Sequence, residues 1–180
     1  ALFLSSRRVI PGVEWAKTLK GNGAEVGKMV EKGKSQFVGP EIKGKKLGVI
    51  GLGAVGVQVA NAAEELGMKV IGYDPFVKQE QIGDLCEMKE TAKEVWEQAD
   101  FISVHLPVVD STAYSIGREQ FSWMKPTASF INCAHGALIK ENEMIECLKD
   151  GTLFQAGLDV FDSEPIKPES AELFDLDNVI

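Results

Sequence analysis

The sequence is poor in the side chains that build metal and disulfide sites, with two histidines and three cysteines among 180 residues. His105 and His135 are too few for a histidine-rich metal centre. Cys86, Cys133 and Cys147 are an odd set without close pairing, so the sequence predicts neither a disulfide framework nor a zinc site. Reduced thiols of this kind are typical of the cytoplasm, where we expect this protein.

Long apolar runs and an excess of basic charge are also missing. No apolar run approaches the roughly 20 residues that a membrane helix needs, and the apolar part of residues 1–8 is too short for a signal peptide. That segment is more typical of a helix that continues upstream of Ala1. The 27 acidic residues outnumber the 19 basic ones, and the resulting charge of −8 argues against a nucleic-acid-binding surface. The length suits one domain, or one domain with a fragment of another.

A glycine-rich turn is the most informative feature that the sequence does have. The run Gly51-Leu52-Gly53-Ala54-Val55-Gly56 follows the apolar residues 47–50 and precedes a helical stretch. In such a turn Gly51 allows a sharp bend, Gly53 lets the backbone approach a pyrophosphate, and Gly56 lets helix and strand pack closely. The free N–H groups and the positive dipole end of the helix would then face the phosphates of a dinucleotide.

Asp74 completes this fingerprint. It follows a second apolar run that ends in Gly72-Tyr73, and it lies 18 positions beyond Gly56. A carboxylate there can accept hydrogen bonds from the adenosine ribose, whereas a 2′-phosphate would meet like charge. The sequence therefore predicts a site for NAD in preference to NADP. The alternative is a glycine-rich turn without a ligand, which the strand–helix–strand context disfavours.

Strands and helices alternate from Lys46 onwards. This order predicts an α/β fold with a doubly wound, Rossmann-type parallel sheet and helices on both faces. Gly151 is the expected C-terminal cap of the last helix. The expected strands are 47–50, 69–73, 101–105, 128–132 and 153–158, with a fragment at 178–180, and the expected helices are about 54–66, 90–98, 117–124 and 140–149.

Residues 1–40 are expected to lie outside this unit, which we place at residues 41–180. Residues 1–19 have the marks of a helix that Pro11 breaks or restarts. Residues 20–44 are rich in glycine and lysine and have little periodicity, so we expect a long connection there.

The carboxyl ends of the expected strands are where such sheets bind ligands. Besides the glycine turn and Asp74, these ends carry three motifs: His105-Leu106-Pro107, Asn132-Cys133-Ala134-His135-Gly136, and the run from Leu158 to Pro165. With the lead-in from Gly39 to Lys45, they resemble elements of the D-isomer-specific 2-hydroxyacid dehydrogenases, namely HxP, N-x-x-R-G and L-D-V-F-x-x-E-P. The resemblance extends from about Gly39 to Ile180, and residues 5–19 are most similar to the phosphoglycerate dehydrogenases of that family.

The resemblance implies which residues hold NAD. The backbone of the glycine turn would meet the pyrophosphate, and Asp74 the adenosine ribose. Asp159 would bind the carboxamide, although it could also be a carboxylate that caps its own turn. By matched position, the residues that would contact the cofactor are Gly51, Gly53, Ala54, Val55, Gly56, Asp74, Leu106, Pro107, Cys133, Ala134, His135 and Asp159.

The reaction that the resemblance implies is hydride transfer between the nicotinamide and the 2-carbon of a hydroxy acid. In the phosphoglycerate dehydrogenases this oxidises 3-phosphoglycerate, a step of serine biosynthesis. In the family an arginine holds the substrate oxygens and a histidine moves the proton, while a glutamate raises the pKa of that histidine. Glu164 stands at the glutamate position, although it could also be an exposed acid before Pro165.

The sequence departs from the family in two ways. His135 stands at the arginine position, and an imidazole cannot copy the bidentate fork of arginine. The family's catalytic histidine would follow Ile180, and most of the substrate domain would precede Ala1, so we expect the chain alone to be inactive. His105 belongs to the cofactor loop and is expected to serve packing.

The resemblance also implies a homodimer to which residues 1–40 contribute. Two alternatives to a phosphoglycerate dehydrogenase stay open. One is a relative that acts on glyoxylate or hydroxypyruvate, and the other is a non-catalytic NAD-sensing module.

Overall fold

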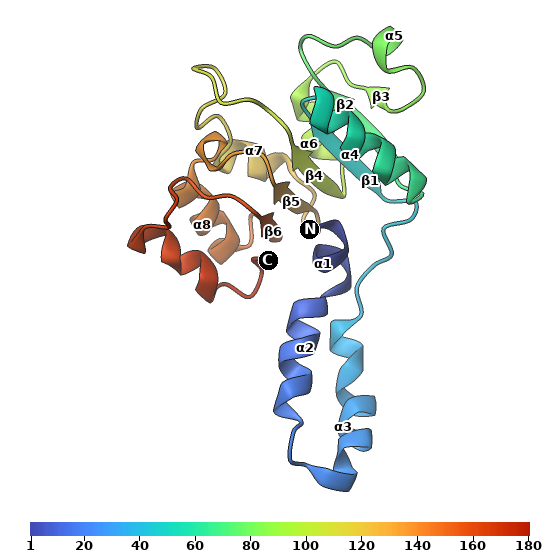
Figure 1. Cartoon of the computed structure of the whole chain (residues 1–180), viewed down its shortest axis with the longest axis vertical. Coiled ribbons are helices and arrows are strands. Elements are labelled where there is room, and N and C mark those ends of the chain that lie inside the picture. The colour runs from blue at the N-terminus through green and yellow to red at the C-terminus, as the bar shows by residue number, and fades with distance from the viewer.

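The computed structural model of the chain is built around one sheet of six strands, with helices on both faces (Figure 1). It describes the whole chain except the side chains of residues 169 and 170. The strands are β1 Lys46–Ile50, β2 Lys69–Tyr73, β3 Glu87–Met88, β4 Phe101–Val104, β5 Ser129–Asn132 and β6 Gln155–Leu158. The α-helices are α1 Leu2–Arg7, α2 Val9–Thr18, α3 Val26–Gly33, α4 Ala54–Glu65, α5 Gln79–Ile82, α6 Ala92–Gln98, α7 Arg118–Trp123 and α8 Glu141–Asp150. Four 3₁₀ helices complete the chain: η1 Gly23–Glu25, η2 Lys34–Phe37, η3 Gly136–Leu138 and η4 Pro168–Asp175.

The strand order is β3-β2-β1-β4-β5-β6, and all the pairs are parallel. The order reverses between β1 and β4, which is the position where doubly wound sheets bind their ligands. The register places Ile50 beside both Tyr73 and Val104, and Asn132 beside both Val104 and Leu158. The carboxyl ends of five strands therefore lie level along one edge.

Residues of β1 alternate between the two faces of the sheet, as the period of a strand requires. Leu47 and Val49 pack with α4 on one face, whereas Ile50 packs with α6, α7 and α8 on the other. Gly48 faces α6 closely, since a Cβ there would lie 2.7 Å from Val95. Both faces are thus covered, and the predicted fold class is confirmed.

Three aromatic rings fill the core between the sheet and α6 and α7. Trp96, Phe121 and Phe130 are almost completely buried. The Phe121 and Phe130 rings meet edge to face at 5.3 Å, and Trp96 stacks on Phe130 at 5.9 Å between ring centroids. Such pairs contribute about 0.5–1.5 kcal/mol beyond the burial of their area, so this cluster holds β5, and with it the loop that follows, against the helices.

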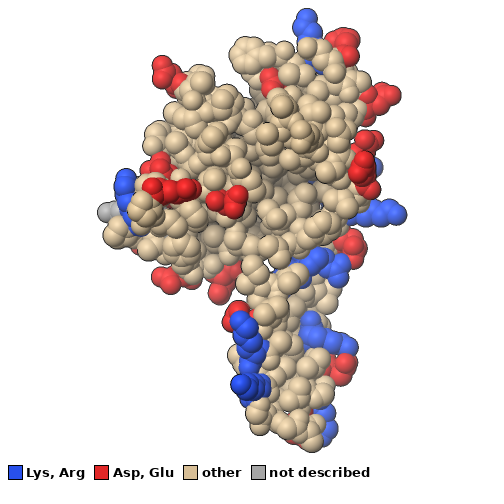
Figure 2. All heavy atoms as spheres, viewed as in Figure 1, with Lys and Arg blue, Asp and Glu red and all other residues tan. Residues whose placement is uncertain are grey.

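Residues 8–38, which we call the arm, project from the body of the molecule as a pair of helices (Figures 1 and 2). The prediction of a long connection over 20–44 is wrong, because α3 and two 3₁₀ helices form there. Val26 and Val30 lie one turn apart and are half-buried positions of α3. The rings of Trp15 and Phe37 pack at 5.0 Å and join the two sides of the arm.

The N-terminal helical segment is interrupted at Arg8 and not at Pro11. Arg8 has a φ of 50° and separates α1 from α2. Pro11 lies in the first turn of α2, where a missing N–H removes no helical bond. α1 belongs to the body, because a Cβ on Gly157 of β6 would lie 3.4 Å from the Ser5 hydroxyl.

The remaining elements agree with the sequence within a few residues. α6 begins at a capping box in which the Glu94 N–H donates to the Thr91 hydroxyl at 3.3 Å. Gly151 ends α8 with a φ of 80°, as expected of a C-cap glycine. The expected fragment 178–180 forms a parallel bridge between Val179 and Ala156. The sequence analysis missed β3, α5 and η4.

Candidate functional site

In the turn between β1 and α4, the local structure requires glycine at positions 51 and 56 but not at position 53. Gly51 has a φ of 93°, and its N–H donates to the Tyr73 carbonyl at 2.9 Å. A Cβ on Gly56 would lie 2.0 Å from the Gly51 carbonyl oxygen, so only glycine fits there. A Cβ on Gly53 would meet nothing within 4 Å. Packing within the protein therefore does not require glycine at position 53, and the space above the turn is open there.

The N-terminus of α4 opens onto this space. The first helical bond runs from the Val57 N–H to the Gly53 carbonyl at 3.0 Å, so the preceding N–H groups point out of the helix. Neither a capping side chain nor an acidic residue occupies the first turn, and Val55 is 63% exposed. Free N–H groups and a positive dipole end of this kind bind phosphate.

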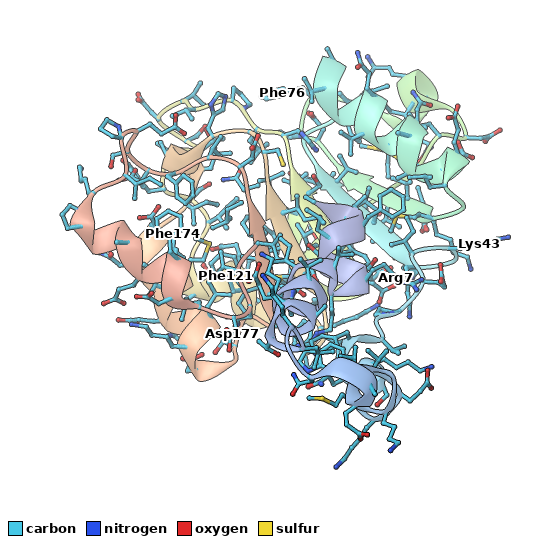
Figure 3. All side chains as sticks on the ribbon, turned by 60° about the horizontal axis from the view of Figure 1, so that its bottom comes forward. Arg7, Lys43, Phe76, Phe121, Phe174 and Asp177 are labelled. Carbon is cyan, nitrogen blue, oxygen red and sulfur yellow. The ribbon has the colours of Figure 1, made fainter. Side chains whose placement is uncertain are left out.

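Asp74 lies beside the same turn, at the end of β2. Its Oδ2 accepts the Leu52 N–H and its Oδ1 accepts the Phe76 N–H, both at 2.8 Å. These two bonds fix the carboxylate and leave lone pairs on both oxygens for a hydroxyl donor. Phe76 is 90% exposed at the rim of this edge (Figure 3).

The loop after β4 approaches the turn from the other side. The His105 N–H donates to the Ile50 carbonyl at 2.7 Å, and Leu106 lies 3.3 Å from a Cβ placed on Gly51. The His105 ring bonds the Ser103 hydroxyl at 2.9 Å, and burial lowers the pKa of the imidazole. His105 is therefore a neutral packing residue, as its position in the motif suggested. Pro107 follows, exposed.

Asn132, at the end of β5, holds the next loop in shape. It is 1% exposed, and its amide donates to the His135 carbonyl at 2.9 Å while its Oδ1 accepts the Ala134 N–H at 3.1 Å. Its own carbonyl accepts the Asp159 N–H at 3.0 Å. The sequence analysis quoted Asn132 in a motif but assigned it no role. The sequence feature that could have indicated a role for Asn132 is its polar amide at the end of a buried strand.

The loops after β5 and β6 touch at Gly136. A Cβ on this residue would lie 1.9 Å from the Phe161 carbonyl oxygen, so the two backbones meet. Cys133, His135 and Asp159 are exposed on this side. Partial burial of the Cys133 sulfur, followed by the charge of Asp159, raises the pKa of the thiol. Cys133 is therefore a neutral thiol at neutral pH.

Glu164 lies five positions beyond Asp159 on the loop after β6 and is exposed. Within the described part of the chain, neither the Glu164 carboxylate nor the His135 ring forms a hydrogen bond or an ion pair. The structure thus brings the predicted cofactor residues to one edge, and it gives the side chains of the two predicted catalytic residues no polar partner among the described residues.

Two further findings concern other classes of site. The described residues contain no group of three or more histidine, cysteine, aspartate or glutamate side chains placed to hold a metal ion. None of the helices described is long and apolar enough to cross a membrane.

Known proteins resemble this chain in sequence and in structure. D-3-phosphoglycerate dehydrogenase of Methanocaldococcus jannaschii is 45% identical over 148 residues, which are 82% of this chain and 28% of that protein. Glyoxylate reductase of Thermococcus litoralis is 35% identical over 181 aligned positions, covering all of this chain and 53% of that protein. The NAD-complexed structure of a D-isomer specific 2-hydroxyacid dehydrogenase from Lactobacillus delbrueckii ssp. bulgaricus matches with a TM-score of 0.75 and 32% identity, over 81% of this chain and 49% of that one.

The chain thus spans 28% of the first of these relatives and about half of the other two. Residues 6–180 match the family model described as "D-isomer specific 2-hydroxyacid dehydrogenase, NAD binding domain". The match includes the turn, Asp74 and all three strand-end loops. The chain belongs to the family of D-isomer specific 2-hydroxyacid dehydrogenases, as its NAD-binding domain.

Proposed function

We propose that the chain is the cofactor domain of an NAD-dependent enzyme that acts on a 2-hydroxy acid. The observation that carries this proposal is the open N-terminus of α4 with the Asp74 carboxylate fixed beside it. The helix end suits the pyrophosphate, and the carboxylate suits a ribose that bears both of its hydroxyls.

The rest of the bound NAD would follow the level carboxyl edge of the sheet. Leu106 and Pro107 would line the adenine side, while Cys133, Ala134 and His135 would approach the nicotinamide half. Asp159 would accept a hydrogen bond from the carboxamide, and its N–H bond to the Asn132 carbonyl holds the start of its loop in place. NAD would supply hydride acceptance, while these residues bind and orient it.

For the parent enzyme we propose 3-phosphoglycerate as the substrate, because the similarity to D-3-phosphoglycerate dehydrogenase reaches 45% identity. Glyoxylate or a related 2-oxo acid is the second candidate, supported by the 35% identity to glyoxylate reductase over the whole chain. Glu164 would hold the proton-moving histidine in its charged form. His135 would take the place of the substrate-binding arginine. Because an imidazole would bind a substrate carboxylate more weakly than a guanidinium does, a non-catalytic NAD-sensing module is a third candidate.

Asp74→Ala is expected to weaken NAD binding by about 10- to 100-fold, because hydrogen bonds to a charged group contribute about 1.5–3 kcal/mol. NADP should bind the unchanged chain more weakly than NAD. The substitution should reduce this difference in affinity, because it removes the like charge near the 2′-phosphate. Calorimetric titration of both cofactors checks this. Asp84→Ala, at another exposed acid, is the control and should change neither affinity. Equal affinities for NAD and NADP in the unchanged chain would contradict the role of Asp74.

The charges of the chain are divided between the arm and the body. The arm, residues 8–38, contains six of the 19 basic residues and three of the 27 acidic ones, so the rest of the chain holds 13 basic and 24 acidic residues. Figure 2 shows basic side chains gathered on the arm and acidic ones spread over the visible face of the body. Val9, Ile10 and Val13 of α2 are each more than 40% exposed. We therefore propose a homodimer in which the arm of one protomer contacts its partner.

Ile10→Asp combined with Val13→Asp is expected to convert this dimer into a monomer. Burying each such side chain contributes about 1.5–3 kcal/mol, so the loss of two should raise the dissociation constant at least about 100-fold. Light scattering coupled to size exclusion gives the mass. Ser35→Asp together with Thr18→Asp adds the same charge at exposed polar positions of the arm and should leave the dimer intact. A monomeric mass for the unchanged chain at high concentration would count against the dimer.

A further inference from the structure

Four apolar residues in a row open the loop after β4, and we call Leu106-Pro107-Val108-Val109 the apolar run. Leu106 packs partly against the core, whereas Pro107 is exposed and Val108 and Val109 are 42% and 49% exposed. Figure 1 shows the loop rising from the carboxyl edge of the sheet. Consecutive apolar residues exposed to water are avoided unless they serve a function, so the apolar run is a candidate contact surface.

The side chain of Thr112 folds the apolar run back onto its own loop. Its hydroxyl donates to the Pro107 carbonyl at 2.5 Å and accepts the Val109 N–H at 2.9 Å. The Val109 carbonyl lies farther from this hydroxyl, at 3.2 Å, and accepts the N–H groups of Thr112 and Ala113 at 2.9 and 2.8 Å. One proton and one lone pair of a single hydroxyl thus hold residues 107 and 109 together. Among the described residues, no other side chain bonds to the backbone of the apolar run.

Both ends of the loop are anchored, so the shape that Thr112 imposes is fixed relative to the edge of the sheet. At the start of the loop, the His105 N–H donates to the carbonyl of Ile50, the last residue before the glycine turn, at 2.7 Å. Near its end, the Tyr114 N–H donates to the Ala137 carbonyl at 2.8 Å. Between these anchors, the Thr112 hydroxyl decides where the apolar run points.

We propose that Thr112 is a positioning residue that presents the apolar run to the adenine of NAD. The part of this inference that concerns the cofactor rests on the proposed function. β2 and β4 flank β1 in the sheet, so Asp74 and the apolar run lie on either side of the glycine turn. With the pyrophosphate at α4 and the ribose at Asp74, the adenine is the uncharged group at this end of the cofactor, and its apolar faces suit an apolar surface. Thr112 acts through the backbone of Pro107 and Val109.

Hydrogen exchange of the free chain tests the loop without a cofactor. Thr112→Val keeps the branched shape and removes the hydroxyl, so the Val109 N–H loses its acceptor. Exchange of this amide, measured by NMR, should become about two- to tenfold faster, which is the factor for one lost hydrogen bond. Unchanged exchange of the Val109 amide would overturn the proposal.

Two further variants serve as controls for the hydroxyl. Thr112→Ser keeps it, so the Val109 amide should exchange as in the unchanged chain. Ser115→Ala removes a hydroxyl that donates to the Thr112 carbonyl at 2.8 Å and does not reach the apolar run, so it should also leave this amide unchanged. A faster Val109 amide in Ser115→Ala as well would overturn the specific role of Thr112.

Calorimetry tests whether the apolar run serves the adenine. Thr112→Val should weaken the binding of NADH and of ADP-ribose by the same factor, about two- to tenfold, because both ligands carry adenine. Thr112→Ser should restore both affinities. A loss of affinity for NADH without an equal loss for ADP-ribose would place the effect at the nicotinamide half and overturn the proposal.

A double-mutant cycle tests whether Thr112 acts through the apolar run. Val108→Ala combined with Val109→Ala removes apolar surface and should itself weaken the binding of both ligands. Adding Thr112→Val to this pair should weaken binding no further, because residues that act as a unit are not additive. Additive losses would overturn the positioning role.

Failure of the unchanged chain to bind either ligand would instead overturn the proposed function and, with it, the cofactor part of this inference. Exchange of the Val109 amide would still decide whether Thr112 holds the apolar run.

Discussion

Gly53→Ala is expected to weaken NAD binding at least about tenfold while leaving the fold at least as stable as before. A Cβ at this position meets nothing within 4 Å, and the residue has a φ of −70°, which alanine adopts readily. Replacing glycine with alanine at such a site stabilises a protein by about 0.4–1 kcal/mol, through the unfolded chain. The added methyl group would instead occupy space that the pyrophosphate needs in order to reach the N–H groups of α4. Each charge-assisted bond that is lost costs about 1.5–3 kcal/mol.

Gly56→Ala is the matched variant at the closed end of the same turn. Its Cβ would lie 2.0 Å from the Gly51 carbonyl oxygen, so α4 and β1 must move apart. Overpacking of this kind costs about 1–3 kcal/mol, which corresponds to a fall in Tm of several degrees. Thermal unfolding and calorimetric titration together separate the two glycines, because Gly56→Ala should lower both stability and affinity. Unchanged NAD affinity in Gly53→Ala would contradict the assigned site, and so would a loss of Tm as large as that of Gly56→Ala.

The central strands and their helices were predictable because their signals are local. β1, β2, β4 and β5 are short apolar runs buried on both faces, and each is bounded by a turn or by a polar residue. Their helices carry recognisable ends, such as the Thr91–Glu94 capping box and Gly151. The glycine turn and Asp74 were found for the same reason, since their spacing reflects one strand–helix–strand unit.

The elements that were missed depend on tertiary contacts. β3 is two residues long and is defined only by its pairing with Ile71 and Gly72. α3 contains glycine near both ends and little apolar surface. It packs on the other helix of the arm, α2, through the contact between Gly33 and Trp15. A single sequence does not show which distant side chain will cover such a segment.

The same distinction applies to the site. The strand ends were predicted, but the contacts between their loops follow from the register of the parallel sheet. Pairing of Asn132 with Leu158 brings the Asp159 N–H to the Asn132 carbonyl, and it also brings Gly136 against Phe161. These contacts hold the nicotinamide side of the proposed site, and they join residues more than 20 positions apart in the sequence.

The isolated chain is expected to bind NADH but to reduce no 2-oxo acid. In the proposed site, binding would rest on backbone groups and on Asp74, all of which the chain supplies. Proton transfer needs a histidine that reaches the substrate, and His105 is occupied with Ser103 while the His135 ring has no carboxylate partner among the described residues. Loss of a general acid typically costs about 10²–10⁴ in rate. Fluorescence titration with NADH and an absorbance assay with hydroxypyruvate and glyoxylate check the two halves of this prediction. Measurable turnover by the isolated chain would contradict it.

His135→Arg is expected to raise kcat/KM for a 2-oxo acid by about 10- to 100-fold in a protein that joins this domain to a substrate domain and a proton-transferring histidine. The guanidinium can hold a carboxylate through two parallel bonds, which an imidazole cannot do, and bonds between charged groups contribute about 1.5–3 kcal/mol each. Lys140→Arg, which places a guanidinium on the exposed residue just beyond η3, is the control and should leave kcat/KM unchanged. A rise in kcat/KM confined to His135→Arg would identify the parent as an enzyme whose substrate binding is weakened by His135. No gain, with NADH binding intact, would instead favour the NAD-sensing module, because a site without a substrate has nothing for the restored arginine to hold.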